Sequence, residues 1–431
     1  VILEYPNLDE SQNIDMGGSF NGEITIEENE VTSDITITGI YIENNGEYEE
    51  SNTVPSEGYV LNTEQSTCSN NASMGYDSSN NQVYVSNLNT SGTECTLYYD
   101  EYVPTAVDTI LADKTIDTSR SGAITGTLTT NTTGTVYSVA DDYGTSYVYA
   151  GAPTDNWVYF AGYYWRIIRI NGDGSIRMIY NGTSTTTTGT STQIQTSAYN
   201  SSYNDNAYVG YMYGRTGTSS YSATHANTTD STVKIILDTW YENNIKGTQY
   251  EKYISTEQGF CNDRSLNTTS ETWWASDTKL GYATNATAYG SFGRILLNGS
   301  YRSSQNPSLK CNQMNDYFSI SGSTKGNYAL EYPVGLINID EVVLAGGFGG
   351  TANQSYYLYT GQEYWTMSPY AFDVTNAPNN RASIFRVLSD GYLSNDWVNN
   401  TNGVRPVINL SSNVQVSGNG TIDSPYTVVG I

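Results

Sequence analysis

The 431-residue sequence contains a single histidine, His225. A lone histidine cannot assemble a zinc site without Cys or carboxylate partners at suitable spacing. A Ser-His-Asp hydrolase would also have to use His225, and the chain around it has no G-x-S-x-G nucleophile motif. Paired carboxylates of a glycoside hydrolase stay open, since any two acids can converge in space. We expect a surface position for His225, no catalytic residues, and a protein that is not an enzyme.

Basic residues are also few, because 18 Lys and Arg stand against 44 Asp and Glu and give a formal net charge of -26. Such a negative field is not expected to bind nucleic acid or an anionic membrane surface. The negative charge is concentrated in the first part of the chain. There are 24 acidic and 2 basic residues before position 151, and 20 acidic and 16 basic residues from position 151 onward. This step predicts a domain boundary between residues 137 and 151.

Long apolar runs are missing as well. No stretch approaches the roughly 20 apolar residues that a membrane-spanning helix needs, so direct membrane insertion by this chain is not expected. The first residue is Val1 rather than Met, and we expect a mature or trimmed product whose export signal or anchor is missing from this sequence.

Cysteine is scarce, with four residues in an Asn-rich, Lys-poor chain, which indicates an oxidising, extracellular or cell-surface location. Four cysteines allow three pairings. The simplest assignment places one bridge in each half of the chain, Cys68 to Cys95 and Cys261 to Cys311. Free buried thiols are the alternative.

Tyrosine, in contrast, is abundant, with 39 Tyr against 8 Phe in a background of Asn, Ser, Thr and Gly. Tyr combined with these small polar residues is typical of adaptable binding surfaces. The alternative is that Tyr simply suits half-exposed strands.

The chain is expected to be multidomain and β-rich. Residues 1–103 predict an acidic, all-β, sandwich-like module, because segments 20–26 and 35–41 alternate apolar and polar residues as half-buried strands do. Turn signals such as Asn44-Asn45-Gly46 separate further short strands. These strands are expected at 59–62, 83–85 and 96–99. Residues 104–135, rich in Thr, Ser and Gly, predict a connector.

Residues 136–431 predict an α+β domain. Its clearest helix is 231–246, whose apolar residues recur at helical spacing. A second, short helix is expected after Asn338 or Asp340, ending at Gly346-Gly347. Low-complexity residues 181–229 predict a long loop that is either functional or mobile.

The Asn171-Gly172-Asp173-Gly174 turn joins two predicted strands, 157–170 and 175–180, and it lacks the Asp/Asn ladder of an EF-hand loop. It predicts a hairpin rather than a calcium site.

Four segments carry a resemblance to known proteins: WVYFAGYYWRIIRINGDGSIRMIYNG (157–182), YPVGLINIDEVVLAGG (332–347), YWTMSP (364–369) and GVRPVINL (403–410). They resemble a family of secreted or surface-attached proteins of gut Firmicutes. That family is similar to the C-type-lectin-like fold of formylglycine-generating enzymes and of the variable proteins of diversity-generating retroelements. The resemblance covers residues 136–431 and implies a C-type-lectin-like domain. Redox-active cysteines near the C-terminal motifs, which the enzymes would need, are missing after Cys311.

In the retroelement-diversified proteins the C-terminal face is the ligand-binding surface, so the resemblance implies a site within residues 365–402. Alternation in 383–388 and 404–410 assigns the apolar positions to the sheet and leaves the intervening polar loops exposed. The buried set is expected to be Phe385, Val387, Val404, Val407 and Ile408. The expected ligand-binding residues, on one exposed face, are Tyr370, Asp373, Asn376, Asn379, Arg381, Tyr392, Asn395, Asp396 and Trp397.

Two functions follow as expectations. The first is an extracellular recognition or adhesion protein that binds a glycan or protein on another surface. The second is a structural subunit that self-associates into an extracellular pilus-like filament or surface layer. No cofactor is expected; calcium is the only metal considered, because Asp and backbone oxygens abound and C-type-lectin-like domains sometimes use it.

Overall fold

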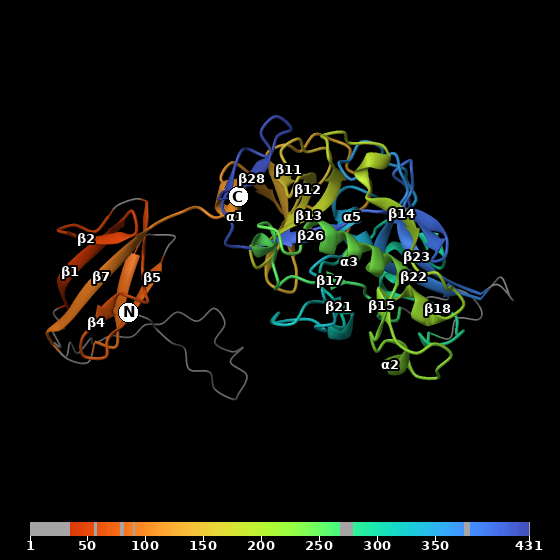
Figure 1. Ribbon diagram of the computed structural model, residues 1–431, viewed down its shortest axis with the longest axis horizontal. Helices are drawn as coiled ribbons and strands as arrows, with labels where there is room; N and C mark the ends of the chain where they lie inside the picture. The colour runs from red at the N-terminus through yellow and green to blue at the C-terminus, as the bar shows by residue number, and fades with distance from the viewer. Residues whose placement is uncertain are drawn as a thin grey trace, which may run out of the picture. The chain divides into compact units, whose positions relative to one another are not determined.

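The computed structural model describes residues 35–55, 58–77, 82–88, 91–267, 279–374 and 380–430, and it shows a β-rich chain with several separate sheets. The chain divides into two compact units, Val1–Val103 and Pro104–Ile431. Figure 1 labels the elements of each.

The described part of the first unit is built from strands. They are β1 (Ile35–Asn44), β2 (Glu47–Ser51), β3 (Tyr59–Leu61), β4 (Thr67–Cys68), β5 (Ser73–Asp77), β6 (Gln82–Ser86) and β7 (Thr93–Glu101). One sheet has the order β2-β1-β7-β3, with β4 also paired to β7, and β5 and β6 form a separate ribbon. The β1–β2 turn uses Asn45 and Gly46 at φ of 53° and 87°, which a type I′ hairpin requires. The strands predicted at 35–41, 59–62, 83–85 and 96–99 are confirmed, and the one predicted at 20–26 lies outside the described residues.

The ribbon packs against one face of this sheet. The sheet contributes a cluster of buried apolar residues, Leu61, Leu97 and Tyr99, and the ribbon residues packed against this cluster are Met74, Tyr76 and Val83. Cys68 and Cys95 stand directly opposite each other on β4 and β7 and form the expected disulfide.

Two large sheets form the second unit. The first has the order β27-β28-β11-β12-β10-β9-β8, with β13 joining β12 to β26. Its strands are β8 (Thr115–Asp117), β9 (Thr135–Ala140), β10 (Thr145–Val148), β11 (Trp157–Phe160), β12 (Tyr163–Ile170), β13 (Ile176–Gly182), β26 (Val407–Leu410), β27 (Val416–Ser417) and β28 (Tyr426–Val428). The second has the order β14-β25-β22-β23-β24, with β18 paired to β22. Its strands are β14 (Gln195–Ala198), β18 (Thr287–Ala288), β22 (Tyr364–Asp373), β23 (Arg381–Val387), β24 (Leu393–Trp397) and β25 (Thr401–Val404).

Shorter elements complete the second unit. The two-stranded sheets are β15 (Met212–Tyr213) with β16 (Thr229–Asp230), β17 (Phe260–Cys261) with β21 (Tyr317–Phe318), and β19 (Leu296–Leu297) with β20 (Ser300–Tyr301). The α-helices are α1 (Ala106–Leu111), α2 (Tyr221–Thr224), α3 (Thr232–Asn244), α4 (Gly290–Ile295) and α5 (Ile339–Leu344). The 3-10 helices are η2 (Thr190–Thr192), η3 (Asn206–Val209), η4 (Glu251–Tyr253) and η5 (Met314–Asp316).

Both predicted helices are present. The Ser231 side chain caps α3 by accepting the N–H of Lys234, and the buried face of α3 includes Val233, Leu237 and Tyr241. Helix α5 has a capping box, in which Asn338 accepts the N–H of Glu341 while the Glu341 side chain accepts the N–H of Asn338. The start of each helix is thus fixed by side chains that lie within one turn of its first residue.

Residues 104–135, predicted as a connector, are part of the second unit. Ala106 and Ile110 of α1 are fully buried, and β8 pairs in parallel with β9. Ile124 exchanges two backbone hydrogen bonds with Gln305, at 2.7 and 2.8 Å. Composition suggested a linker because Thr, Ser and Gly are polar or small. Their backbone groups nevertheless find partners far along the chain, so this segment cannot act as a free tether.

Residues 181–229, predicted as one long loop, contain two short strands and three short helices. Tyr199, Val209 and Tyr211 from this segment are fully buried in the core of the second unit. The low-complexity composition hid these anchors, because they occur without a helical or strand period in a segment dominated by Asn, Ser, Thr, Gly and Tyr.

Arg120 closes the C-terminal end of α5. Its Nε donates to the carbonyl of Leu344 at 2.7 Å and its Nη2 to that of Val343 at 2.8 Å. We expect Arg120→Ala to lower the free energy of unfolding by about 1–3 kcal/mol, because two buried carbonyls lose a charged donor. All seven tryptophans follow position 156, so urea denaturation followed by Trp fluorescence reports on the second unit.

The exposed Arg215 provides the control, and Arg215→Ala should leave the midpoint unchanged. Equal midpoints for the Arg120 and Arg215 variants would show that the hydrogen bonds of Arg120 to α5 do not stabilise the second unit.

Candidate functional site

The register of β22, β23 and β24 decides which candidate residues share a face. Asp373 pairs with Arg381, and Asn395 pairs with Phe385. Trp397 pairs with Ser383. Because alternate positions of a strand point to the same side, Asp373, Arg381, Asn395 and Trp397 lie on one face of this sheet.

On this face the Arg381 guanidinium lies over the Trp397 indole, 3.6 Å from the ring centroid, and 5.0 Å from that of Tyr203. A cation held against an aromatic ring contributes roughly 0.5–1 kcal/mol at an exposed site. The stack therefore holds the half-buried indole in one orientation.

Three tyrosines gather on the same face. The Tyr392 ring stands edge-on to Tyr301 of β20, with centroids 5.4 Å apart. Tyr370 meets Phe385 edge-on at 5.0 Å. Burial, followed by the charge of Asp373 and by Tyr392, raises the pKa of the Tyr370 hydroxyl. Burial, followed by Tyr392 and Tyr370, does the same for the pKa of Tyr301. The hydroxyls are thus close enough to influence one another.

We call this set the β22–β24 face. Its residues are Tyr301, Tyr370, Asp373, Arg381, Tyr392, Asn395 and Trp397. Sequence reasoning missed Tyr301, because in a chain with 39 tyrosines no local signal distinguishes it.

The structure corrects two details of the expected site. Its described members are half-buried rather than exposed, and Tyr370 packs between Phe292 and Phe385 at 5.0 Å from each, as part of the core. Asp396 pairs with Ile384 and so points to the opposite side of the sheet.

Asp396 is used within the fold. There it binds Arg386 at 2.9 Å and accepts the side-chain amides of Asn400 at 2.6 Å and Asn402 at 3.0 Å. With these three partners its carboxylate is a structural group and is not offered to a ligand.

The other expected residues fall into two groups. The five residues expected to pack inward are buried: Phe385, Val387, Val404, Val407 and Ile408. Phe385 and Val387 nevertheless lie on the same face of the sheet as Arg381, so the expected separation of the two sets onto different faces is wrong for β23. Asn376 and Asn379 lie outside the described residues.

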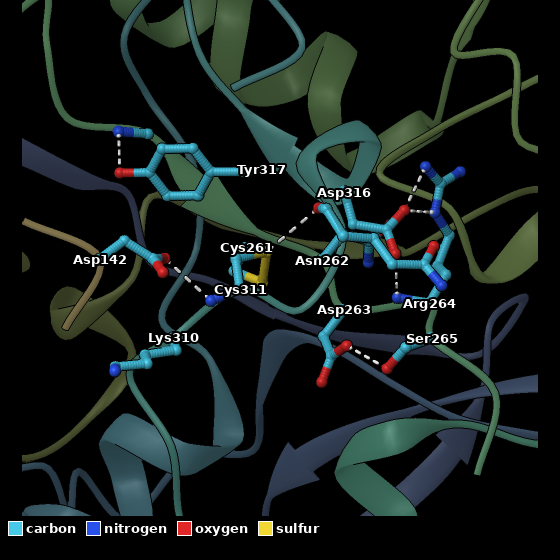
Figure 2. Close-up of a disulfide and its surroundings, with 12 residues drawn as sticks. Asp142, Cys261, Asn262, Asp263, Arg264, Ser265, Lys310, Cys311, Asp316 and Tyr317 are labelled. Carbon is cyan, nitrogen blue, oxygen red and sulfur yellow. Dashed lines mark hydrogen bonds and ion pairs between the residues drawn. A yellow bond between two sulfur atoms is a disulfide. The ribbon is translucent and has the colours of Figure 1, made fainter. Parts of the chain in front are cut away.

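The cysteines of the second unit are structural. Figure 2 shows the expected Cys261–Cys311 disulfide, whose Cys311 N–H donates to the Asp142 carboxylate at 2.9 Å. Beside it Asp316, fully buried, accepts the Nε of Arg264 at 2.8 Å. All four cysteines of the chain are in disulfides, which fits an extracellular protein.

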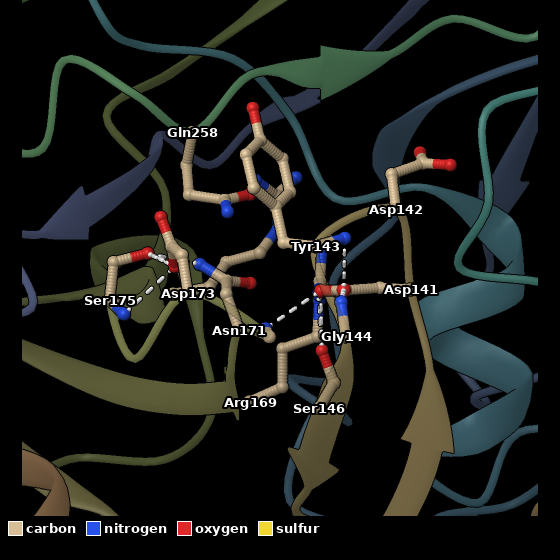
Figure 3. A network of polar contacts seen from close by, with 12 residues as sticks. Asp141, Asp142, Tyr143, Gly144, Ser146, Arg169, Asn171, Asp173, Ser175 and Gln258 are labelled. Carbon is tan, nitrogen blue, oxygen red and sulfur yellow. Dashed lines mark hydrogen bonds and ion pairs between the residues drawn. The ribbon is translucent and has the colours of Figure 1, made fainter. Parts of the chain in front are cut away.

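Acidic residues near the β12–β13 hairpin also serve the fold, as Figure 3 shows. Asp141 binds Arg169 at 2.9 Å and accepts the N–H groups of Tyr143 and Gly144. Burial alone would raise the pKa of Asp141, but the charge of Arg169 and hydrogen bonds from Gly172, Ser146 and Tyr143 bring it below the ordinary value. Asp173 accepts from both the N–H and the hydroxyl of Ser175, so the predicted hairpin turn is confirmed.

His225, expected at the surface, is 1% exposed. Its ring lies on Tyr221, with centroids 3.8 Å apart, and its Nε2 is 3.1 Å from the carbonyl of Gly281. Nδ1 has no hydrogen-bond partner among the described residues. Burial, followed by the charge of Arg264, lowers the pKa of His225 to about 2, against the effect of the Gly281 bond. Its sequence context gave no periodicity from which this burial could be predicted.

Within the described ranges, no three His, Cys, Asp or Glu side chains are grouped so as to hold a metal ion. Nor does the described part of the chain contain a helix that is long and apolar enough to cross a bilayer. The chain matches no family model, no curated protein and no solved structure.

The buried His225 predicts a pH dependence of stability. Between its ordinary pKa of about 6.5 and its folded value of about 2, only the unfolded chain binds the proton, so stability falls as the pH drops below about 6.5. The loss should approach about 1.4 kcal/mol per pH unit, or about 2 kcal/mol at pH 5 relative to pH 7. Urea denaturation at each pH measures it.

A His225→Gln variant, although less stable overall, should not show this loss of stability between pH 7 and pH 5. If its stability declines as steeply as that of the wild type, another group is responsible.

Proposed function

We propose that this chain is an extracellular recognition protein whose second unit binds a glycan or a protein through the β22–β24 face. The observation that carries the proposal is the Arg381–Trp397 stack between β23 and β24, with Asn395 on β24 and Tyr392 immediately before that strand. Trp, Tyr and Arg are the residues that dominate binding energy at interfaces. Here they are fixed on a sheet, so little conformational entropy is lost when a ligand binds.

A C-type-lectin-like architecture for the second unit is part of the proposal. It is supported by the return of the C-terminal strands β26 and β28 to the sheet of β11, β12 and β13. This arrangement holds the end of the domain beside its beginning. The β22–β24 face then belongs to a separate sheet, as a recognition surface on a lectin-like scaffold would.

A non-catalytic role is supported by the chemistry of the second unit. Its histidine is buried, its cysteines are oxidised, and Asp141, Asp316 and Glu341 are each paired with arginine. These groups stabilise the fold and are not arranged around a common cavity.

The alternative is a structural subunit that polymerises. Addition of a strand from another copy requires a free sheet edge. At one edge of the main sheet of the first unit lies β2, which carries Glu47, Glu49 and Glu50. Like charges on a second copy would oppose pairing there, which favours recognition over polymerisation through this edge.

We expect Trp397→Ala and Tyr392→Ala each to weaken binding at least about tenfold, the effect of losing a hot-spot residue. Binding is measured on an immobilised panel of glycans and purified extracellular matrix proteins, using the panel members that the wild-type chain binds. Thermal denaturation of each variant should show only a small loss, because neither side chain is fully buried.

Tyr328→Ala is the matched control, since Tyr328 is 51% exposed and belongs to another part of the unit. It should bind as the wild type does. Wild-type affinity in both site variants would contradict the proposed face. Regular polymers in light scattering, with no panel member bound, would favour the structural subunit.

A further inference from the structure

A cavity of about 610 Å³ opens in the second unit, away from the β22–β24 face. It is lined by residues from the start of β11, from β12, and from loops near positions 188, 355 and 422. Figure 1 shows β11, β12 and β28 side by side, and the pairing of these strands brings the distant segments together. The volume is typical of small-molecule sites, which range from about 300 to 1,000 Å³.

Arg166 of β12 lines this cavity, which we call the Arg166 pocket, and it is 3% exposed. Its Nε donates to Asn156 Oδ1 at 2.7 Å and its Nη2 to the carbonyl of Pro153 at 2.9 Å. No carboxylate of the described residues forms an ion pair with it, and no hydrogen bond from its Nη1 occurs among them. A buried guanidinium is therefore held in place without a counter-charge.

Four other arginines of the second unit are neutralised. Each of the following lies 2.6 to 3.1 Å from a carboxylate: Arg169, Arg177, Arg264 and Arg294. Two more buried arginines form no ion pair among the described residues but donate to backbone carbonyls, Arg120 to those of Leu344 and Val343 and Arg405 to those of Tyr180 and Thr192. Arg166 differs from all of these because it also faces a cavity.

The residues around Arg166 hold its guanidinium in place but do not neutralise its charge. Its guanidinium lies 4.2 Å from the Trp157 ring centroid and 5.3 Å from that of Tyr357. Asp155 acts on it electrostatically, but that carboxylate already binds Lys114 at 3.1 Å and the N–H of Gly134 at 2.8 Å. Burial is the largest effect and lowers the pKa of Arg166 to about 9. An uncompensated buried cation is unfavourable, and an anion in the pocket would remove that penalty.

A second observation also points to a ligand. The Tyr357 hydroxyl is buried and has no hydrogen-bond partner among the described residues, although its ring lines the pocket and contacts Arg166. Buried polar groups are almost always hydrogen-bonded, so an unpartnered hydroxyl on a side chain that lines a cavity is a place where a ligand can supply the missing partner. A carboxylate held by Arg166 could accept from this hydroxyl.

The rest of the wall indicates the kind of molecule. Tyr359, which is half-buried, offers aromatic surface for the C–H face of a sugar ring, while Thr188 and Gln354 offer groups for its hydroxyls. Asp423, exposed at the rim, can accept from hydroxyl donors but would repel a ligand that is anionic throughout. A single acidic group on an otherwise neutral polar molecule fits this distribution.

We propose that the Arg166 pocket binds a saccharide that carries a carboxylate, with Arg166 binding the carboxylate and Tyr357 donating to it. This site is separate from the β22–β24 face and does not depend on it. The chain then has two recognition sites, one of which selects for acidic sugars.

The test is isothermal titration calorimetry of the full chain with sodium glucuronate, glucose and sodium acetate. Glucuronate should bind at least about tenfold more tightly than either glucose, which lacks the charge, or acetate, which lacks the ring. Equal binding of acetate and glucuronate would reduce the pocket to a simple anion site and overturn the saccharide assignment. Equal binding of glucose and glucuronate would remove the role of Arg166.

Arg166→Gln should weaken glucuronate binding at least about tenfold, because the amide keeps a donor but loses the charge. Since this variant alters a buried network, Tyr357→Phe provides a second measurement. Removing an unpartnered hydroxyl should leave folding intact or slightly raise the melting temperature, yet lower the affinity severalfold.

Tyr149→Phe is the control for the second variant. Tyr149 is buried and its hydroxyl also has no partner among the described residues, but it does not line the pocket. It should match Tyr357→Phe in stability and match the wild type in affinity. Wild-type affinity in both folded variants, Arg166→Gln and Tyr357→Phe, would overturn the proposal. Unchanged glucuronate binding by Trp397→Ala would show that the two sites are distinct.

Discussion

The second unit depends on one buried carboxylate, that of Glu341 in α5. Its Oε1 lies 3.1 Å from Arg169 Nε on β12 and 2.6 Å from Arg177 Nε on β13, and the side chain is fully buried. Burial alone would raise the pKa of Glu341, but Arg177 and Arg169, with the N–H of Asn338, bring it below its ordinary value. Loss of one partner would leave a buried charge uncompensated, at a cost of about 3–5 kcal/mol. The position of α5 on the first sheet is therefore strongly specified.

The same helix also fixes the second sheet. The N–H of Ile339 donates to Ser368 Oγ at 2.9 Å, and the N–H of Met367 in β22 donates to the carbonyl of Ile337 at 2.7 Å. Helix α5 thus joins the sheet that contains Arg166 to the sheet that contains Trp397. The segment that follows α5 supplies the 354–359 wall of the Arg166 pocket before it enters β22. Both proposed sites are consequently built on strands and loops that the contacts of α5 hold in place.

What could be predicted from the sequence was local. The helix that begins after Ser231, the short helix after Asn338 and the turn after Ile170 each depend on residues within a few positions, so pattern and propensity were enough to predict them. Contacts between residues that are far apart in the chain could not be predicted in this way. Arg120 bonds to carbonyls more than 200 positions away, and a Thr-rich segment that looked like a linker is anchored by it. Likewise, alternation placed Asp396 among the site residues, but only the strand register shows that it faces the other side of the sheet.

The two arginines of the segment WRIIRI cannot be distinguished from the sequence, but their contacts in the structure distinguish them. Arg166 and Arg169 lie three positions apart in one apolar strand, and nothing in their local context separates them. The pairing of β12 with β13 shifts register between Ile167 and Arg169, so Arg166 lies opposite Ile179 and Arg169 opposite Arg177, and strand alternation does not separate the two arginines either. Arg169 meets Asp141 and Glu341, so its charge is satisfied by the fold. Arg166 meets two aromatic rings and a cavity, so the fold alone leaves its charge unbalanced. A buried charge with an internal partner stabilises the structure, whereas one held rigidly without a partner is a reason to look for a ligand.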